Sequence, residues 1–385
     1  MAHNDHLEVI LKLTEVCNIA CKYCYYFFSG DDRPGNRPAN LSETVTHKLV
    51  EFLNEGFLEG AYKTIQIDFH GGEPMMLGHS KFKRIVAILS EGLEVQPRLA
   101  ITTNAMFITD NWIDTFSSHS VNVCVSVDGP QAIHDRQRID KRGAGTYKRV
   151  HQGIKVLQDA VQKKKISEIS ALCVVQSNVD GAEVYRHIVH DLGIKHLDFL
   201  LPDNTHDTFD ISNAISIKNF MKGAFSEWLS DDDPKIQVRL FDSVLQLLVG
   251  GQSRLGGFGA RAGTPTAITI GSDGSVDGDD FLKPTGVENI ATGLSILSSP
   301  FAEIIERINH KEIGRELSAL PDGCLGCTFN ACCGGGQATH RYSKTQRFNN
   351  PSIHCDTQKM LFSLAASHLI SSGIDPVDIA HNAMK

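Results

Sequence analysis

The sequence predicts an α/β protein with a curved parallel sheet and a smaller cysteine-rich region near its C-terminal end. Six strand-like apolar runs alternate with helix-like patterns in roughly the first 200 residues. This alternation is typical of a parallel sheet that curves or closes like a barrel. The chain has 385 residues, more than one compact core usually holds. We therefore expect a partial (β/α)6 TIM-like barrel over residues 1–205, a helical bridge over 206–258 and a small C-terminal domain over 259–385.

The individual elements follow from the spacing of apolar residues. Strands are predicted at residues 7–13, 64–69, 98–103, 121–127, 169–175 and 196–201. Helices are predicted after Ser42, whose hydroxyl can cap a helix, and over 79–92, 109–118, 146–163 and 182–192. Further along, the pattern indicates two helices within 212–250, a hairpin over 266–281 and a closing helix at about 356–371. Loops at the C-terminal ends of the parallel strands should carry the chemistry, as they do in complete barrels.

Composition excludes several classes of protein. The net charge is −8, whereas nucleic-acid-binding proteins usually carry a basic field. No apolar stretch approaches the roughly 18 residues that a membrane-spanning helix needs, and no signal peptide is visible. We therefore expect a cytoplasmic protein without a nucleic-acid or membrane partner. In a reducing compartment, its ten cysteines indicate metal or redox sites rather than disulfides.

The first cysteine group directly follows the first predicted strand, with the spacing Cys17-x3-Cys21-x2-Cys24. Three thiolates on one short loop can bind three irons of a four-iron cluster, which normally takes four cysteines. The remaining iron would then stay open for a small ligand. The alternative is a zinc loop, although zinc usually takes four protein ligands in paired spacings.

The context of this loop resembles the radical S-adenosylmethionine (SAM) enzymes. The segment LKLTEVCNIACKYCYY is similar to their signature loop, and HGGEP, which begins at His70, follows the second strand where that family has its GGEP motif. The resemblance implies that a [4Fe–4S] cluster cleaves S-adenosylmethionine to a 5′-deoxyadenosyl radical. It also implies a set of cofactor-binding residues: Tyr23, His70, Gly71, Gly72, Glu73, Asn104, Ser126, Arg138 and Leu201.

The second cysteine group supplies four further ligands, Cys324, Cys327, Cys333 and Cys355. Four cysteines can saturate a second [4Fe–4S] cluster, and spacing alone leaves structural zinc open. Cys332 lies beside Cys333, and either could bind. The group resembles the SPASM domain of peptide-modifying radical enzymes, whose full form has seven cysteines and two auxiliary clusters. Two upstream cysteines of that pattern are missing, with Asp279 at one position where a cysteine is expected, and a third is missing where Gln337 stands. The resemblance therefore implies one auxiliary cluster.

The C-terminal tail resembles maturases that crosslink ribosomally made peptides, including those that form cyclophanes. This implies a precursor peptide as substrate, C–C bond formation at an unactivated side-chain carbon, and an electron donor such as flavodoxin or ferredoxin. Asp280 matches an aspartate that serves as base in some relatives, and the alternative is a solvated carboxylate in a turn. Other outcomes stay open. These are formylglycine formation as in sulfatase maturases, epimerisation with Cys124 as hydrogen donor, and a non-catalytic scaffold or sensor.

Overall fold

The computed structural model describes residues 5–253, 255, 257–259, 267–310 and 312–384. The chain packs into two compact units that are not continuous in sequence. Unit 1 comprises residues 1–127, 134–170 and 266–311, and unit 2 comprises residues 128–133, 171–265 and 312–385. The predicted division into residues 1–205, 206–258 and 259–385 stays a prediction. None of the described helices combines the length and the apolar character that crossing a bilayer requires.

Unit 1 is built on a sheet with the strand order β10-β9-β8-β1-β2-β3-β4. The parallel strands are β1 (His6–Thr14), β2 (Thr64–Gly71), β3 (Arg98–Thr103), β4 (Asn122–Ser126) and β8 (Ala267–Ile270). The antiparallel strands are β9 (Ser275–Asp277) and β10 (Ala291–Ser295). The predicted hairpin is therefore present as β8 and β9. Its partner was not foreseen: β8 adds to the sheet beside β1.

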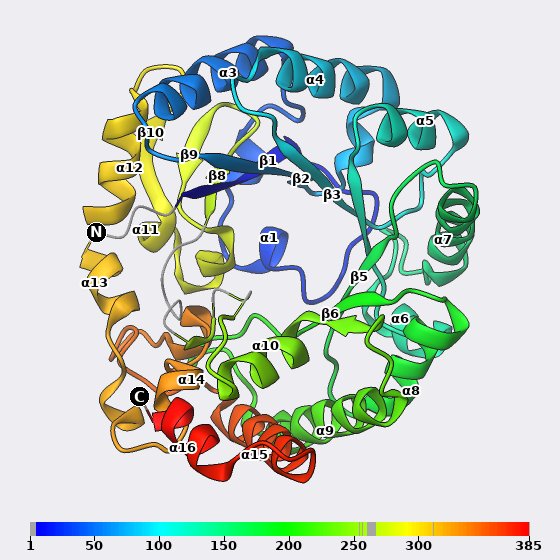
Figure 1. Ribbon diagram of the computed structural model, residues 1–385. Coiled ribbons are helices and arrows are strands. Elements are labelled where there is room, and N and C mark those ends of the chain that lie inside the picture. The colour runs from blue at the N-terminus through cyan, green and yellow to red at the C-terminus, as the bar shows by residue number, and fades with distance from the viewer. Residues whose placement is uncertain (1–4, 254, 256, 260–266, 311, 385) are drawn as a thin grey trace. The chain divides into compact units, whose positions relative to one another are not determined.

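Helices cover the outer side of this sheet (Figure 1). They are α3 (Glu43–Leu58), α4 (His79–Gly92), α5 (Asp110–Ser118), α7 (Tyr147–Gln162) and α12 (Phe301–His310). Ser42 caps α3 as expected, because its side chain accepts a hydrogen bond of 3.2 Å from the backbone N–H of Val45. The apolar stripe of α4, with Phe82, Val86 and Leu89, is fully buried. Short helical turns complete the unit: α1 (Tyr25–Phe28), α2 (Arg33–Asn36), η1 (Pro74–Leu77), η5 (Asp280–Thr285) and α11 (Val287–Ile290).

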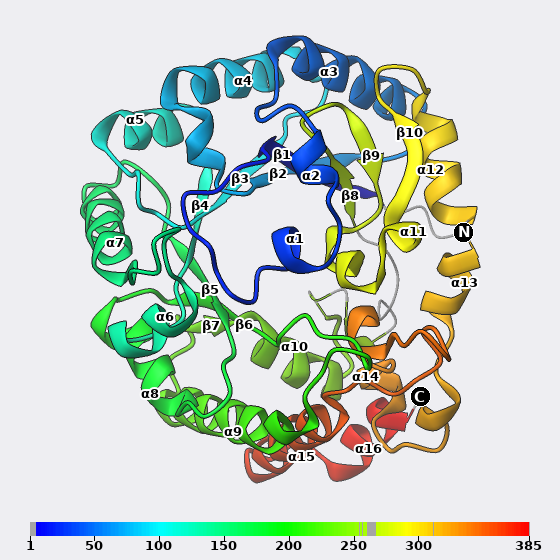
Figure 2. The same cartoon turned by 180° about the vertical axis from the view of Figure 1, so that it is seen from behind.

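Unit 2 contains three further strands, β5 (Ser170–Val174), β6 (His196–Leu200) and β7 (Gln237–Val238). Its helices are α8 (Gly181–Arg186), α9 (Ala214–Asp231), α10 (Arg239–Leu248), α13 (Glu312–Ser318), α14 (Asn330–Cys333), α15 (Cys355–Ser371) and α16 (Pro376–Met384). The remaining helix, α6 (Gln131–Gln137), has residues in both units. Helices α9, α10 and α15 pack against one another (Figure 2). The aromatic residues Phe220, Phe225 and Phe241 fill the core between α9 and α10.

The six predicted strands all form, each within two residues of its expected bounds. The helix predicted over 182–192 differs, because α-helical hydrogen bonding ends at Arg186 and a π-type turn, η2 (His187–Asp191), follows. The elements that were not predicted include β7, β10, α12, α13 and α16. A two-residue strand carries too little periodicity to be recognised, and α16 buries only Ile379 and Ala383.

Candidate active site

Cys17, Cys21 and Cys24 lie together on the loop between β1 and α1. The backbone N–H of Cys24 donates to the carbonyl of Cys21 at 3.0 Å, and that of Ala20 donates to Ile139 at 2.8 Å, so the loop is held at both places. All three thiols are half-buried. Burial raises the pKa of Cys17 to about 12, and the neighbouring Cys21 and Cys24 act in the same direction. The loop therefore brings the three predicted ligands together.

The two glycines of the HGGEP segment, Gly71 and Gly72, pack closely against the backbone at the start of this loop. The backbone N–H of Gly72 donates to Thr14 at 2.9 Å, and the next N–H along the chain donates to Val16 at 2.9 Å. A Cβ on Gly72 would lie 2.2 Å from the carbonyl oxygen of Val16, and one on Gly71 would lie 2.2 Å from that of Thr14. Gly71 also has a φ of +138°. These positions require glycine because the backbone of the cysteine loop approaches them so closely.

Replacing Gly72 by alanine should therefore displace the start of the cysteine loop. Relieving the clash with Val16 forces a backbone shift, which typically costs about 1–3 kcal/mol or more in a packed site. We expect the variant to retain much less iron than the wild type after anaerobic reconstitution and gel filtration. Gly35→Ala is the matched control, because a Cβ at Gly35 meets nothing within 4 Å. Equal iron content in the two variants would contradict this account of the glycine packing.

Glu73 joins the ends of β2 and β3 from a fully buried position. Its carboxylate accepts hydrogen bonds from the hydroxyl of Thr103 at 2.6 Å and from the backbone N–H groups of Asn104 at 2.8 Å and Met75 at 3.1 Å. Burial raises the pKa of Glu73 to about 7, although these hydrogen bonds lower it. The side-chain amide of Asn104 donates to Asn18 at 2.9 Å, within the cysteine loop. Two predicted cofactor-binding residues thus lie at one edge of the sheet beside the cysteines.

Arg138 lies over the same loop. One guanidinium nitrogen is 3.9 Å from the sulfur of Cys21, and the guanidinium carbon is 5.5 Å from the ring centroid of Tyr23. The side chain is buried, and the hydroxyl of Thr146 donates to the Arg138 carbonyl at 2.7 Å. Ser126 is the last residue of β4 and is half-buried. Leu201, the remaining predicted contact, follows β6 in unit 2.

Asp280 belongs to a buried polar network in unit 1. The ammonium of Lys12, on β1, lies 2.5 Å from a carboxylate oxygen of Asp280 and 3.0 Å from Nδ1 of His70. The hydroxyl of Tyr25, next to the last cysteine of the loop, donates to the same carboxylate oxygen at 2.8 Å. Asp280 is only 8% exposed, so the alternative of a solvated turn carboxylate is wrong. The chain thereby gathers residues from β1, β2, α1 and η5 around one carboxylate.

The ion pair and hydrogen bonds around Asp280 determine the protonation states of Asp280 and His70. Burial alone would raise the pKa of Asp280, but Lys12, His70 and the hydrogen bond from Tyr25 outweigh burial and hold that pKa at about 2. Burial lowers the pKa of His70 to about 4, and the Lys12 ammonium acts in the same direction. Asp280 is therefore ionised and His70 neutral near neutral pH.

The ring of Tyr26 lies close to the ammonium groups of two buried lysines, Lys12 and Lys283. The Tyr26 ring has the Lys12 ammonium at 4.6 Å from its centroid and the Lys283 ammonium at 3.9 Å. Lys283 pairs with Asp31 at 3.1 Å, and the Tyr26 hydroxyl donates to Glu15. The sequence reasoning did not identify these residues. The available signal was a lysine in the middle of the apolar run of β1, where a charge needs a buried partner.

In unit 2, the four cysteines of the second group line one small cavity, together with Phe329 and Phe362: Cys324, Cys327, Cys333 and Cys355. They come from η6 (Asp322–Cys324), the following loop, α14 and the first residue of α15. Burial raises the pKa of Cys333 to about 12, and its three cysteine neighbours add to that rise. The structure thus brings together the four residues whose spacing predicted a ligand set.

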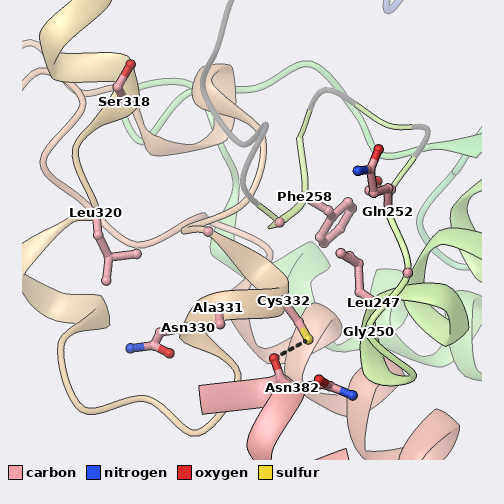
Figure 3. Close-up of a pocket in the computed structure, with 14 residues that line it drawn as sticks. Leu247, Gly250, Gln252, Phe258, Ser318, Leu320, Asn330, Ala331, Cys332 and Asn382 are labelled. Atoms are coloured by element: carbon pink, nitrogen blue, oxygen red, sulfur yellow. Dashed lines mark hydrogen bonds between the residues drawn. The ribbon is translucent and has the colours of Figure 1, made fainter. Parts of the chain in front are cut away.

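Cys332 does not line the cavity formed by the four cysteines of the second group. Its sulfur donates to the backbone carbonyl of Asn382 at 3.4 Å, and it lines a separate cavity with Leu247 and Phe258 (Figure 3). The sulfur of Cys333 instead lies 3.3 Å from the side-chain oxygen of Gln358, beside the other cysteines. Of the two adjacent cysteines, Cys333 is therefore the one placed with the ligand set.

The number of thiols in each cysteine group indicates which kind of metal centre it could hold. Within the described part of the chain, no three His, Cys, Asp or Glu side chains are arranged to hold one metal ion. Three cysteines at the β1 loop fit a cluster with one open iron, and four in unit 2 fit a saturated cluster.

Comparison with known proteins shows which family and which relatives this chain is similar to. The profile of the radical SAM superfamily matches residues 11–180. The serine-type anaerobic sulfatase-maturating enzyme of Bacteroides thetaiotaomicron is 27% identical over 370 residues, covering 88% of this chain and 84% of that protein. The cysteine-type enzyme of Clostridium perfringens is 27% identical over 380 residues, covering 95% of this chain and 98% of that protein.

Solved structures agree in fold. The structure of native anSMEcpe with bound AdoMet has a TM-score of 0.77 at 23% identity, and the match covers 98% of this chain and 100% of that one. The same protein with AdoMet and the Cp18Cys peptide has a TM-score of 0.76 at 23% identity, with 95% and 98% covered. The predicted α/β class with a parallel sheet of the partial-barrel type is confirmed. Residues 11–180 match the radical SAM superfamily, and most of the chain is similar to anaerobic sulfatase-maturating enzymes.

Proposed function

We propose that this enzyme oxidises a side chain of a peptide substrate by two electrons, with Asp280 as the base. The observation that carries the proposal is the buried Asp280 carboxylate, which Lys12 and Tyr25 hold ionised beside His70. The relatives support a peptide as substrate, since they are sulfatase-maturating enzymes and one solved structure contains a bound peptide.

The residues of the β1 loop would hold the radical-generating cofactors. Cys17, Cys21 and Cys24 would bind a [4Fe–4S] cluster, with Glu73 toward the amino group of S-adenosylmethionine and Arg138 toward its carboxylate. These cofactors supply a 5′-deoxyadenosyl radical, which takes a hydrogen atom from a substrate carbon. Tyr23, His70, Gly71, Gly72, Asn104, Ser126 and Leu201 complete the proposed cofactor-binding set.

Cys324, Cys327, Cys333 and Cys355 would hold the auxiliary [4Fe–4S] cluster, whose contribution is an acceptor for the second electron. A small electron carrier such as flavodoxin or ferredoxin is the proposed donor for the first cluster. Asp280 accepts the proton that must leave when the substrate radical is oxidised. The substrate thus loses one hydrogen atom, one proton and one electron, which is two hydrogens in total.

Two different products could form with this loss of two hydrogens from the substrate. Oxidation of a cysteine or serine gives formylglycine, with Asp280 taking the proton from sulfur or oxygen, and a cysteine product must also exchange its sulfur for water oxygen. The relatives support this outcome over the crosslink that the tail motifs suggested. The crosslink is the second candidate. Its support is the cysteine set, because Asp279 and Gln337 stand at two positions where the sulfatase maturases are expected to have cysteines.

The test is an anaerobic assay with sulfatase-derived peptides that carry cysteine, serine or alanine at the modified position. We expect 5′-deoxyadenosine together with a product that a hydrazide probe traps as an aldehyde, from the cysteine or serine peptide but not from alanine. Loss of two hydrogens from a precursor peptide without aldehyde would favour the crosslink. Solvent deuterium incorporation at unchanged composition would indicate epimerisation. Absence of 5′-deoxyadenosine under reducing conditions would reject the proposal in favour of a scaffold.

A further inference from the structure

Lys12 is a buried cation that contacts both Asp280 and His70. It lies near the C-terminal end of β1 with 1% of its surface exposed. An ammonium removed from water in this way is costly unless it is paired and hydrogen-bonded. Its two hydrogen-bonding partners are the carboxylate of Asp280 and Nδ1 of His70, at 2.5 and 3.0 Å.

We propose that Lys12 is a positioning residue of the active site, which keeps Asp280 as a carboxylate and fixes His70 in one tautomer. The inference rests on the proposed function, in which Asp280 is the base. Because an ammonium can only donate, Nδ1 of His70 must accept, and the imidazole proton must lie on Nε2. The ammonium of Lys12 therefore determines both the ionisation of Asp280, the proposed base, and the tautomer of His70, a proposed cofactor contact.

The surroundings of Asp280 explain why the cation matters. The titratable groups that face it are Lys12 from β1, His70 from β2, and Tyr25 and Tyr26 from α1. His70 and Tyr26 are uncharged near neutral pH, so the ammonium of Lys12 supplies the positive charge at hydrogen-bonding distance. Without it, a buried carboxyl with a single tyrosine donor favours its protonated form. A protonated Asp280 cannot take a proton from the substrate.

Lys283 provides an internal comparison. It is buried in the same way, and its ammonium lies against the same Tyr26 ring, at 3.9 Å. Its ion pair, however, is with Asp31 at 3.1 Å rather than with Asp280. Removing either lysine therefore takes a buried ammonium from the same aromatic ring, but only the loss of Lys12 takes the charge away from the proposed base.

The experiment compares Lys12→Met with Lys283→Met in the reconstituted full chain. Peptide product and 5′-deoxyadenosine are measured separately as a function of pH. For Lys12→Met, an acid limb of product formation should enter the assay range, since each pH unit below the raised pKa of Asp280 lowers its ionised fraction about tenfold. Product should recover at alkaline pH, and 5′-deoxyadenosine formation should continue throughout. For Lys283→Met, the pH profile should keep the wild-type shape.

The outcomes separate this inference from the function on which it rests. An unshifted profile in a folded Lys12→Met protein, or equal losses in both lysine variants at every pH, would overturn the positioning role. Lys12→Gln keeps a donor of similar length without the charge, so it should show the same shift if the methionine variant does not fold. If Asp280→Asn leaves product formation intact, the base assignment itself fails, whatever the lysine variants do.

Discussion

Replacing Cys17, Cys21 and Cys24 together by alanine abolishes the formation of 5′-deoxyadenosine from S-adenosylmethionine. The three thiols lie on one loop and are the proposed ligands of three irons, so none of these irons keeps a protein ligand in the variant. The auxiliary site lies in the other unit and is untouched. The iron content of reconstituted protein should therefore fall from about eight per chain to about four.

Cys332→Ala is the control for this iron count. Cys332 is a buried cysteine beside a proposed ligand, but its sulfur contacts Asn382 in a separate cavity. The control should keep about eight irons. Residual cofactor cleavage in the triple variant would show that the loop is not the radical-generating site. A wild type with one zinc and only about four irons would show that the unit 2 cysteines hold zinc.

Local pattern was sufficient for much of this fold. Strands β2, β3, β4 and β5 alternate between buried apolar positions and more exposed ones, so each was recognisable without its neighbours. The cysteine groups were equally local, since Cys17 to Cys24 and Cys324 to Cys333 each fall within ten residues. Spacing along the chain therefore anticipated which cysteines would meet, although it left Cys332 and Cys333 equivalent until α14 placed their sulfurs in different cavities.

The polar network could not be predicted in the same way. Lys12 and Asp280 are 268 residues apart, and they meet because β8 adds to the sheet beside β1 and carries η5 with it. No periodicity encodes that pairing. Likewise, the glycines at 71 and 72 read as cofactor-approach positions, whereas their immediate constraint is the backbone of Thr14 and Val16. Residues whose roles depend on long-range packing are those that sequence reasoning missed.

Replacing Asp280 by asparagine separates radical formation from product formation. Asparagine keeps a side-chain oxygen that can accept from Lys12 and Tyr25, but it cannot take a proton from the substrate. Peptide product should fall by about 10²–10⁴-fold, the usual contribution of a positioned general base, while 5′-deoxyadenosine continues to form. Because the pKa of Asp280 is about 2, the wild-type base is ionised throughout the assay range, and the loss should be the same at every pH.

Asp31→Asn is the matched control, because Asp31 is a buried carboxylate that pairs with Lys283, whose ammonium also lies near the Tyr26 ring. It should keep the wild-type ratio of product to 5′-deoxyadenosine. Parallel loss of both products in Asp280→Asn would mean that the residue supports the fold of the radical site rather than the later proton transfer. Unchanged product would mean that the proton leaves by another group. A selective loss that Asp31→Asn does not share would assign the proton to the one carboxylate that Lys12 holds ionised.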